Sequence, residues 1–256
     1  MQAFYTGASG LVSQSQSLDI TANNLANAQT TGFKTSRANF QDLLYSSLSN
    51  GGIGSSGGPG LGVSFGGGAG ISSTQLDFEQ GPLQSTGENY DLAIRGNGFF
   101  AVSDLEGNRF FTRAGNFTLN ADGMLTLPAS SGGLLLEPPI QIPDGTADVV
   151  IGADGTVTAD GVNVGQIIAV GFVNPEGLQQ IGDNLFADTG ASGSPQVGRF
   201  GQDGFGTLAQ GFLEGSNVDT VEQIINLITT QQFFSLDAQS VQAANQELQT
   251  VLDLFA

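Results

Sequence analysis

Carboxylates are the only side chains in this sequence that could support common acid–base chemistry. The chain has 24 Asp and Glu residues and no His or Cys. Catalytic triads, His-liganded zinc, thiolate zinc, iron–sulfur clusters and disulfides are therefore excluded. A glycan hydrolase that uses two carboxylates remains open. Its candidate pairs are Asp104 with Glu106, and Asp154 with Asp160.

These candidate acids fall at turn signals, which favours a structural role for them. Hairpin connections are indicated at four places: Glu106-Gly107-Asn108, Asp122-Gly123, Asp154-Gly155 and Asp160-Gly161. Three Ala-Asp-Gly tripeptides, at 121, 153 and 159, are possible calcium loops. They lack the clustered Asp spacing and the closing Glu of such loops, so we interpret them as hairpin turns. We expect no catalytic residue and no metal site.

A glycine-rich segment contains a match to G-x-G-x-x-G at Gly52, Gly54 and Gly57. A dinucleotide site needs a strand before this motif and a helix after it, and neither pattern is present. We therefore expect no bound cofactor. Residues 49–70 are interpreted as a connecting segment, either a flexible linker or a loop that orders against neighbouring subunits.

The net charge of −18 argues against nucleic acid and anionic membrane surfaces as partners, because both require a basic surface. No apolar run approaches the roughly 20 residues that span a bilayer, so we expect no membrane insertion. The first residues carry no basic region and no long apolar region of the kind that a secretory signal has. Export would then need a route that reads no cleaved signal.

Both ends of the chain show apolar residues at alternating spacings of three and four, the condition for a helix that packs along one stripe. The N-terminal stripe comprises Phe4, Ala8, Leu11, Ser15, Leu18, Ala22 and Leu25. The C-terminal stripe comprises Ile224, Leu227, Gln231, Phe234, Ala238, Val241, Asn245, Leu248, Leu252 and Phe255. We expect the termini to pair with each other or with other copies, as in a self-assembling subunit.

The spacing predicts mainly helix over residues 2–48, with a break at Thr31-Gly32 and a helical or extended pattern beyond it. A second helix is predicted over 218–254, with Asp219 and Glu222 at its start. No Lys or Arg follows Arg199. The outer positions of this helix carry Gln, which suits a helix surrounded by helices or a solvated helix with a Gln bias: Gln223, Gln232, Gln239, Gln242, Gln246 and Gln249.

Between the helices the sequence predicts an all-β antiparallel sandwich or barrel. The expected strands are 91–95, 99–102, 109–112, 149–151 and 167–173. The predicted fold class is therefore α+β, in which terminal coiled-coil-like helices pair and a central antiparallel β domain lies between them. The expected domains are 1–48 with 212–256 for the helices, 49–70 as connector and 71–211 for the β region.

Four motifs, in this order, resemble those of the bacterial flagellar axial proteins, the family of rod and hook subunits. They are 22–27 (Ala-Asn-Asn-Leu-Ala-Asn) with 31–34 (Thr-Gly-Phe-Lys), 91–100 (Asp-Leu-Ala-Ile-Arg-Gly-Asn-Gly-Phe-Phe), 111–117 (Phe-Thr-Arg-Ala-Gly-Asn-Phe) with 122–123 (Asp-Gly), and 211–219 (Gly-Phe-Leu-Glu-Gly-Ser-Asn-Val-Asp). The motifs lie between residues 22 and 219, and the resemblance covers nearly the whole chain.

The resemblance implies a structural, non-enzymatic subunit of a helical tube, with the terminal helices inside and the β domain outside. It implies assembly with other copies and with other rod, hook and ring proteins, in the flagellar basal body, after export through the flagellar type III apparatus. Residues 41–45 and the chain length favour the distal rod, where the tube would transmit torque and form part of the export channel. A hook subunit or a proximal rod subunit is the alternative.

Two groups of residues are expected to matter for this assembly. The seam residues are Phe4, Leu11, Leu18, Leu25, Ile224, Leu227, Phe234, Val241, Leu248 and Leu252. The motif residues are Asn23, Asn24, Leu25, Asn27, Gly32, Phe33, Gly96, Gly98, Phe99, Ser216 and Asn217. Gln232 and Gln239 depart from the family, which commonly has Arg and Lys there. A secreted adhesive β domain is a further alternative, but it leaves the terminal helices unexplained.

Overall fold

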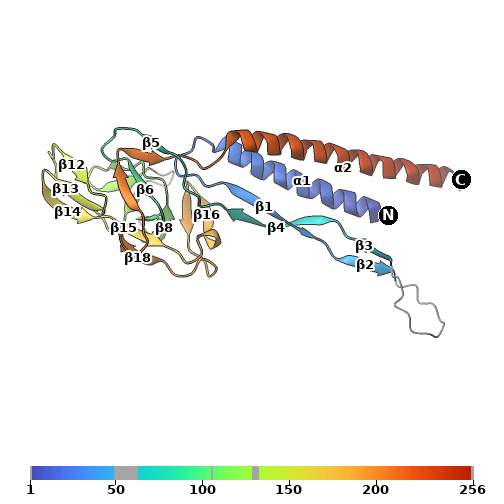
Figure 1. Ribbon diagram of the computed structural model, residues 1–256, viewed down its shortest axis with the longest axis horizontal. Coiled ribbons are helices and arrows are strands. Elements are labelled where there is room, and N and C mark those ends of the chain that lie inside the picture. The colour runs from blue at the N-terminus through green and yellow to red at the C-terminus, as the bar shows by residue number, and fades with distance from the viewer. Residues whose placement is uncertain (1, 49–62, 105, 129–132, 255–256) are drawn as a thin grey trace, which may run out of the picture. The chain divides into compact units, whose positions relative to one another are not determined.

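The computed structural model describes residues 2–48, 63–104, 106–128 and 133–254, and the chain forms two compact units (Figure 1). The terminal unit combines 1–26, 36–75 and 219–256, and the central unit combines 27–35 and 76–218. The expected domain boundaries differ from this division, because 36–48 shares the terminal unit with 69–75, whereas 27–35 and 212–218 belong to the central unit. The Gly52–Gly57 match and Phe255 lie outside the described residues.

Two helices form much of the terminal unit, α1 (Gln2–Ala26) and α2 (Thr220–Leu254), and they run antiparallel and side by side (Figure 1). The predicted C-terminal helix is confirmed to within two residues. Asp219 Oδ1 accepts hydrogen bonds from the backbone amides of Val221 at 2.8 Å and Glu222 at 3.2 Å. Asp219 therefore satisfies two of the amides that a helix start leaves without partners.

The N-terminal helix ends at Ala26, five residues before the expected break, and the chain is extended after residue 35. β1 (Ser36–Asp42) pairs with β4 (Ala69–Leu76), and β2 (Tyr45–Leu48) pairs with β3 (Val63–Gly66). The apolar positions after residue 33 fit both periodicities. Pairing with strands that lie fifteen or more residues later in the chain selects the extended conformation.

This two-stranded ribbon is tied to α1 by short side chains. Ser13 Oγ donates to the carbonyl of Ala69 at 2.9 Å, and Thr6 Oγ1 donates to the carbonyl of Gly66 at 3.4 Å. An added Cβ at Gly68 would lie 1.9 Å from Ser9 Oγ. Small residues on both elements therefore allow the ribbon to lie directly on the helix.

The central unit is built on a seven-stranded antiparallel sheet in the order β16-β17-β8-β7-β11-β10-β9. Its strands are β7 (Phe100–Ser103), β8 (Arg109–Thr112), β9 (Thr118–Leu119), β10 (Leu125–Leu127), β11 (Leu134–Leu136), β16 (Gln179–Gly182) and β17 (Leu185–Ala187). A short 3-10 helix, η1 (Pro175–Gly177), precedes β16.

Smaller antiparallel sheets complete this unit: β12-β13-β14, β15-β18, β19-β6 and β20-β5. Their strands are β5 (Leu83–Ser85), β6 (Leu92–Arg95), β12 (Val149–Ile151), β13 (Thr156–Ala159), β14 (Val162–Gln166), β15 (Ile168–Gly171), β18 (Gln196–Arg199), β19 (Thr207–Gln210) and β20 (Phe212–Glu214). The α+β class is confirmed.

The predicted strands and turns of the central unit are confirmed where local sequence specifies them. Asp160 and Gly161 join β13 to β14 with φ values of +50° and +81°, the left-handed pair of a tight hairpin. Glu106–Asn108 joins β7 to β8. Asp154 Oδ1 accepts from its own turn, at the Thr156 amide. The Asp-Gly pairs are therefore hairpin turns.

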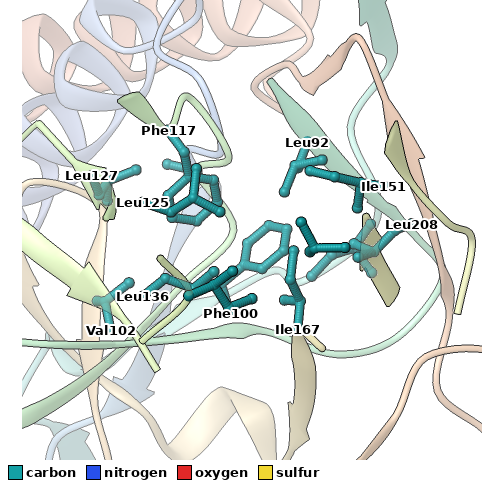
Figure 2. Close-up of a cluster of buried hydrophobic side chains, with 14 of the residues drawn as sticks. Leu92, Phe100, Val102, Phe117, Leu125, Leu127, Leu136, Ile151, Ile167 and Leu208 are labelled. Atoms are coloured by element: carbon teal, nitrogen blue, oxygen red, sulfur yellow. The ribbon is translucent and has the colours of Figure 1, made fainter. Parts of the chain in front are cut away.

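The main core of the central unit is formed by inward-facing residues of several sheets (Figure 2). Phe100 lies among them fully buried, and its ring is 5.2 Å from that of Phe117 in an edge-on arrangement. Aliphatic side chains surround this pair, including Leu92, Val102, Leu125, Leu136, Ile151, Ile167 and Leu208. This core gives the central unit its own source of stability.

We predict that Gly115→Ala lowers the unfolding free energy of the central unit by at least about 2 kcal/mol, because overpacking displaces backbone. A Cβ at Gly115 would lie 1.7 Å from the carbonyl oxygen of Leu92. Urea denaturation followed by near-UV circular dichroism measures the change. Gly190→Ala is the control, since an added Cβ there meets nothing within 4 Å. Equal effects of the two substitutions would contradict the prediction.

Candidate assembly site

An ionic cluster lies buried in the central unit, where segments of the four sequence motifs meet. Glu214 Oε1 is 2.7 Å from Lys34 Nζ, and Glu214 Oε2 is 3.3 Å from Arg113 Nη1. The side chains of Lys34 and Glu214 are completely buried, and Arg113 is 4% exposed. The partners are 180 and 101 residues apart from Glu214 in sequence. One carboxylate therefore joins three distant segments.

Further hydrogen bonds complete the cluster. Lys34 Nζ donates to the carbonyl of Glu79 at 2.6 Å, and the Gly81 amide donates to Glu214 Oε1 at 3.0 Å. Arg113 Nη1 donates to the carbonyl of Gly96 at 3.0 Å. Charges removed from water require such partners, since an unpaired buried charge is strongly destabilising.

Burial lowers the pKa of Lys34 below its usual 10.5, and the nearby Glu214 carboxylate opposes this shift. Burial likewise lowers the pKa of the Arg113 guanidinium, again against the effect of Glu214. A lowered pKa of Lys34 means that the folded chain binds this proton less tightly than the unfolded chain. The contribution of Lys34 to stability therefore rises as the pH increases toward 10.5.

Gly32 attaches the segment after α1 to the segment before α2. Its amide donates to the carbonyl of Glu214 at 2.8 Å, and its φ is +71°. A Cβ at Gly32 would lie 2.6 Å from the backbone nitrogen of Ala114. Only glycine combines this left-handed backbone with so close an approach. The neighbouring Phe33 is buried at 6% exposure.

Asn217 makes a second connection between the same segments. Its Oδ1 accepts hydrogen bonds from the amide and the hydroxyl of Thr35, both at 2.8 Å. Its Nδ2 donates to the carbonyls of Asp77 at 2.9 Å and Glu79 at 3.2 Å. The adjacent Ser216 is buried, and its hydroxyl accepts from the Val218 amide at 3.3 Å. Residues 27–35 and 214–218 are thereby held together within the central unit.

The remaining motif residues of the central unit surround this cluster. The carbonyl of Gly96 accepts a hydrogen bond from Arg113, and the guanidinium carbon of Arg113 lies 5.2 Å from the ring centroid of Phe99. Phe99 is 2% exposed, and Gly98 beside it is also buried. Asn27 Oδ1 accepts from Thr30 Oγ1 at 3.1 Å in the turn after α1.

Asn24 organises the terminal unit in the same manner. Its Nδ2 donates to the carbonyl of Ser36 at 2.8 Å, and its Oδ1 accepts from the Ser36 amide at 3.0 Å. The same Nδ2 lies 3.3 Å from Oε1 of Gln223, near the start of α2. Asn24 is 2% exposed, so its side-chain amide supplies, in place of water, the hydrogen bonds that connect α1 to β1 and α2. Asn23 is exposed and Leu25 is half-buried.

The residues of the predicted seam differ in how far they are buried in the structure. Half-buried side chains on α1 and α2 include Phe4, Leu11, Leu18, Leu25, Leu227, Val241 and Leu248. Three other members of the seam are more exposed, at 44% for Ile224, 37% for Phe234 and 67% for Leu252. The polar positions Gln231 and Asn245 are exposed as well.

The row of α2 that faces α1 includes polar residues that the spacing did not identify. Gln223 is buried, and Thr230 and Asp237 are half-buried. A Cβ at Gly10 of α1 would lie 2.9 Å from Asp237 Oδ2, and one at Gly7 would lie 2.7 Å from Val241 Cγ2. The two glycines therefore let α2 approach α1 closely.

Large apolar side chains of α2 remain uncovered in the single chain. They lie on several faces of the helix, because α1 covers only one row: Val221, Ile224, Ile225, Ile228, Phe233, Leu236, Val251, Leu252 and Leu254. Large apolar side chains exposed on several faces of one helix are typical of an interaction surface.

The ionic cluster is not predicted from the sequence, although Lys34, Arg113 and Glu214 each stand inside one of the four motifs that carry the family resemblance. A partial signal was present, since three of the six basic residues, Lys34, Arg95 and Arg113, fall within Gly- and Phe-rich motifs, and of these Arg95 is exposed. Charges in such surroundings are buried only when they are paired.

The acidic residues considered for catalysis bind nearby backbone: Asp104 binds its own turn, and Asp160 binds the loop that precedes β12. Asp104 Oδ1 accepts from the amides of Glu106 at 2.9 Å and Asn108 at 2.8 Å, and the Asn108 side-chain hydrogen bond lowers the pKa of Asp104. Asp160 Oδ1 accepts from the Ala147 amide at 3.2 Å. Among the described residues, no three acidic side chains are grouped so that they could hold a metal ion. No described helix combines the length and apolarity of a membrane span.

Comparison with known proteins gives matches along most of the chain. Residues 4–34 match the family described as flagella basal body rod protein. Residues 93–159 match the D1 domain of the flagellar hook protein FlgE/F/G, and residues 209–254 match the C-terminal part of the flagellar basal body rod FlgEFG protein. These three regions carry the motifs that form the ionic cluster.

Similar full-length proteins share more than a third of their residues with the chain. Flagellar basal-body rod protein FlgG of Caulobacter vibrioides is 40% identical over 263 residues, 99% of each chain. FlgG of Bacillus subtilis is 35% identical over 99% of each chain. Flagellar basal-body rod protein FlgF of Caulobacter vibrioides is 37% identical over 91% of this chain and 89% of its own length.

We predict that Glu214→Gln lowers the unfolding free energy of the central unit by about 3–5 kcal/mol, because two buried cations lose their carboxylate. Lys34→Met should cost less, since Glu214 keeps its contacts with Arg113 and the Gly81 amide. Urea denaturation measures both effects. Glu137→Gln is the matched control, because the bridge between Glu137 and Arg109 is partly exposed and should contribute under about 1 kcal/mol. A Glu214→Gln effect no larger than the control would refute the prediction.

Proposed function

The chain belongs to the flagellar rod and hook protein family, and from this premise we propose that it is a structural subunit of the distal rod of the flagellar basal body. In this function it polymerises into a helical tube that transmits torque and forms part of the export channel. The observation that carries the proposal is the uncovered apolar surface of α2, in a chain that matches rod proteins from end to end.

Burial of this surface supplies a driving force for polymerisation. Ile225, Phe233 and Leu236 are more than half exposed, at 57%, 51% and 58%. Full burial of a large aliphatic or aromatic side chain contributes about 1.5–3 kcal/mol. Several such residues on each subunit are enough to order a long helix among neighbouring helices.

The polar residues of the helices fit this environment. The described parts of α1 and α2 contain no Lys or Arg, whereas helices that lie on membrane surfaces are commonly basic on the polar face. Gln side chains, which are neutral donors and acceptors, occupy many outer positions of α2. Amides of this kind can hydrogen-bond between packed helices without the cost of burying charge.

The family implies a place in the flagellum and assembly with other rod and hook proteins. Within the proposed function, the tube spans the periplasm and also contacts ring proteins. The subunit reaches this position through the flagellar type III apparatus, without a cleaved signal. No catalytic role is proposed, in keeping with a family of structural rod proteins.

The distal rod is favoured over the hook and the proximal rod by the full-length similarity to FlgG. Relatives from distant bacteria match at 35–40% identity over nearly the whole chain. Residues 27–35 and 76–218 form a single compact unit, and the described residues divide into no further unit beyond this one and the terminal unit. The Gly-rich residues 51–62, which would distinguish a rigid rod from a bending hook, lie outside the described residues.

The purified chain is therefore expected to polymerise into straight tubes visible by electron cryo-microscopy. Leu248→Asp should abolish the tubes, because it places a charge among packed apolar side chains. The near-UV circular dichroism of the central unit should stay unchanged. Leu248→Met conserves volume and apolarity and serves as the control. Curved tubes would favour the hook, and tubes formed by Leu248→Asp would refute the role of the helices.

In the isolated subunit, we predict that amide hydrogens of residues 220–250 exchange faster than those of β6, β7 and β8. The reason is that α2 gains much of its stability from packing, and most of its faces are uncovered in one chain. Hydrogen exchange read by mass spectrometry compares the subunit with the polymer, where α2 should become protected. Full protection of 220–250 in the free subunit would show that the helix needs no neighbour.

A further inference from the structure

A pocket of about 370 Å³ opens in the central unit beside the ionic cluster. Four phenyl rings line it, together with backbone at Gly98 and Gly171, and one basic and one acidic side chain. The rings belong to Phe78, Phe99, Phe172 and Phe205, and the charged groups belong to Arg113 and Asp203. The function proposed above leaves this pocket unused.

The aromatic walls are held in place by one another. The ring centroids of Phe78 and Phe99 are 5.4 Å apart, and those of Phe99 and Phe172 are 5.8 Å apart, both in edge-on arrangements. Phe186, which is fully buried, lies 5.3 Å from Phe78. Such contacts fix the rings, so the pocket is formed before any ligand enters.

Arg113 supplies a hydrogen-bond donor that is not used. Its Nη1 contacts Gly96 and Glu214, whereas its Nε is buried and has no hydrogen-bond partner among the described residues. A buried N–H without an acceptor is costly, and in native structures it calls for a specific explanation. A ligand oxygen in the pocket would satisfy this donor.

Asp203 limits what the ligand can be. It is exposed, it lines the pocket, and it adopts a φ of +52°, which is uncommon for a residue with a side chain. Its carboxylate accepts hydrogen bonds and repels an anion. The ligand should therefore be neutral and aromatic, with an oxygen that accepts from Arg113 and a proton to donate. A phenol combines these properties.

The chain carries such a phenol on the β2–β3 part of its ribbon. Tyr45 is 63% exposed and stands opposite Gly66, where an added Cβ would lie 3.4 Å from the tyrosine ring. The ring therefore rests on its paired strand. Phe40, Leu44 and Phe65 of the same ribbon are also exposed, at 51%, 93% and 42%. A ribbon with this much apolar surface is expected to be covered in the assembled state.

We propose that the pocket between Arg113 and Asp203 receives the side chain of Tyr45 of the partner subunit. The phenyl ring packs against the four phenylalanines, and the hydroxyl lies between the guanidinium and the carboxylate. This contact connects the ribbon of one subunit to the central unit of the next. It rests on the proposed function, because it requires polymerisation of the chain.

The pocket is tested first with a free ligand on the unpolymerised full chain. p-Cresol, the free-molecule analogue of the tyrosine side chain, should bind saturably and shift the NMR amide signals of Gly98 and Gly171. Asp203→Asn removes the carboxylate that would accept a hydrogen bond from the phenol hydroxyl, so it should weaken p-cresol binding about tenfold. Asn also adopts the left-handed backbone conformation, so the loop should keep its shape. Toluene and p-toluate are the matched probes. Binding of toluene as tight as that of p-cresol, or tighter binding of p-toluate, would overturn the phenol assignment, as would no binding of p-cresol.

The occupant is tested in the polymer. Tyr45→Phe should raise the critical concentration for polymerisation about tenfold, whereas Tyr5→Phe, at a tyrosine that is 74% exposed on α1, should leave it unchanged. A photoreactive phenylalanine at position 45 should cross-link to residues 97–99, 171–172 or 203–205 of a neighbour. If the chain polymerises but the cross-links form elsewhere, the assignment of Tyr45 is wrong. It is also wrong if Tyr5→Phe raises the critical concentration more than Tyr45→Phe does. Failure of the unmodified chain to polymerise would instead defeat the proposed function.

Discussion

The carboxylate of Glu214 is the constraint on which the rest of this subunit depends. It lies without solvent contact between Lys34 and Arg113, and it also accepts the amide of Gly81. A buried ion pair adds little net stability, because desolvation offsets most of the attraction. Its effect is on specificity, since any arrangement that separates the three segments leaves a charge unpaired in the interior. The chain leading from α1 and the chain leading into α2 are thus held in one position within the central unit.

Short amide side chains extend this constraint along both connecting segments. Asn217 bonds to the backbone of three other residues, and Asn24 bonds to both backbone groups of Ser36. An Asn side chain has the same donor and acceptor as a peptide group, so it can pair with backbone where no regular structure continues. These residues explain why Asn-rich motifs flank the helices: they replace the hydrogen bonds that the chain loses where a helix ends and a strand begins.

The two units differ in how much of their apolar surface is buried within one chain. The central unit buries its own core around Phe100, with aliphatic residues from several sheets. The terminal unit leaves α2 with apolar residues on most of its faces and only one row against α1. With this division the central unit can fold alone, and the association proposed above would cover the exposed apolar residues of α2. Such a division suits a subunit of a polymer. Ordering the helices costs conformational entropy, and this cost opposes association of free subunits before they reach the growing polymer.

The sequence by itself determined the elements that depend on local signals. Asp-Gly turns, alternating strands, the helix that begins after Asp219 and the α+β class follow from backbone preference and periodicity. Only the tertiary structure decided three further features. The segment after residue 35 is a strand because a partner strand lies at 69–76, whereas its apolar spacing fits a helix equally well. The row of α2 that meets α1 contains Asp237 because Gly10 permits close approach there, and it contains Gln223 because Asn24 binds its side chain. Glu214 pairs with Lys34 and Arg113, which lie 180 and 101 positions before it, and no local property of the chain encodes which charges will meet.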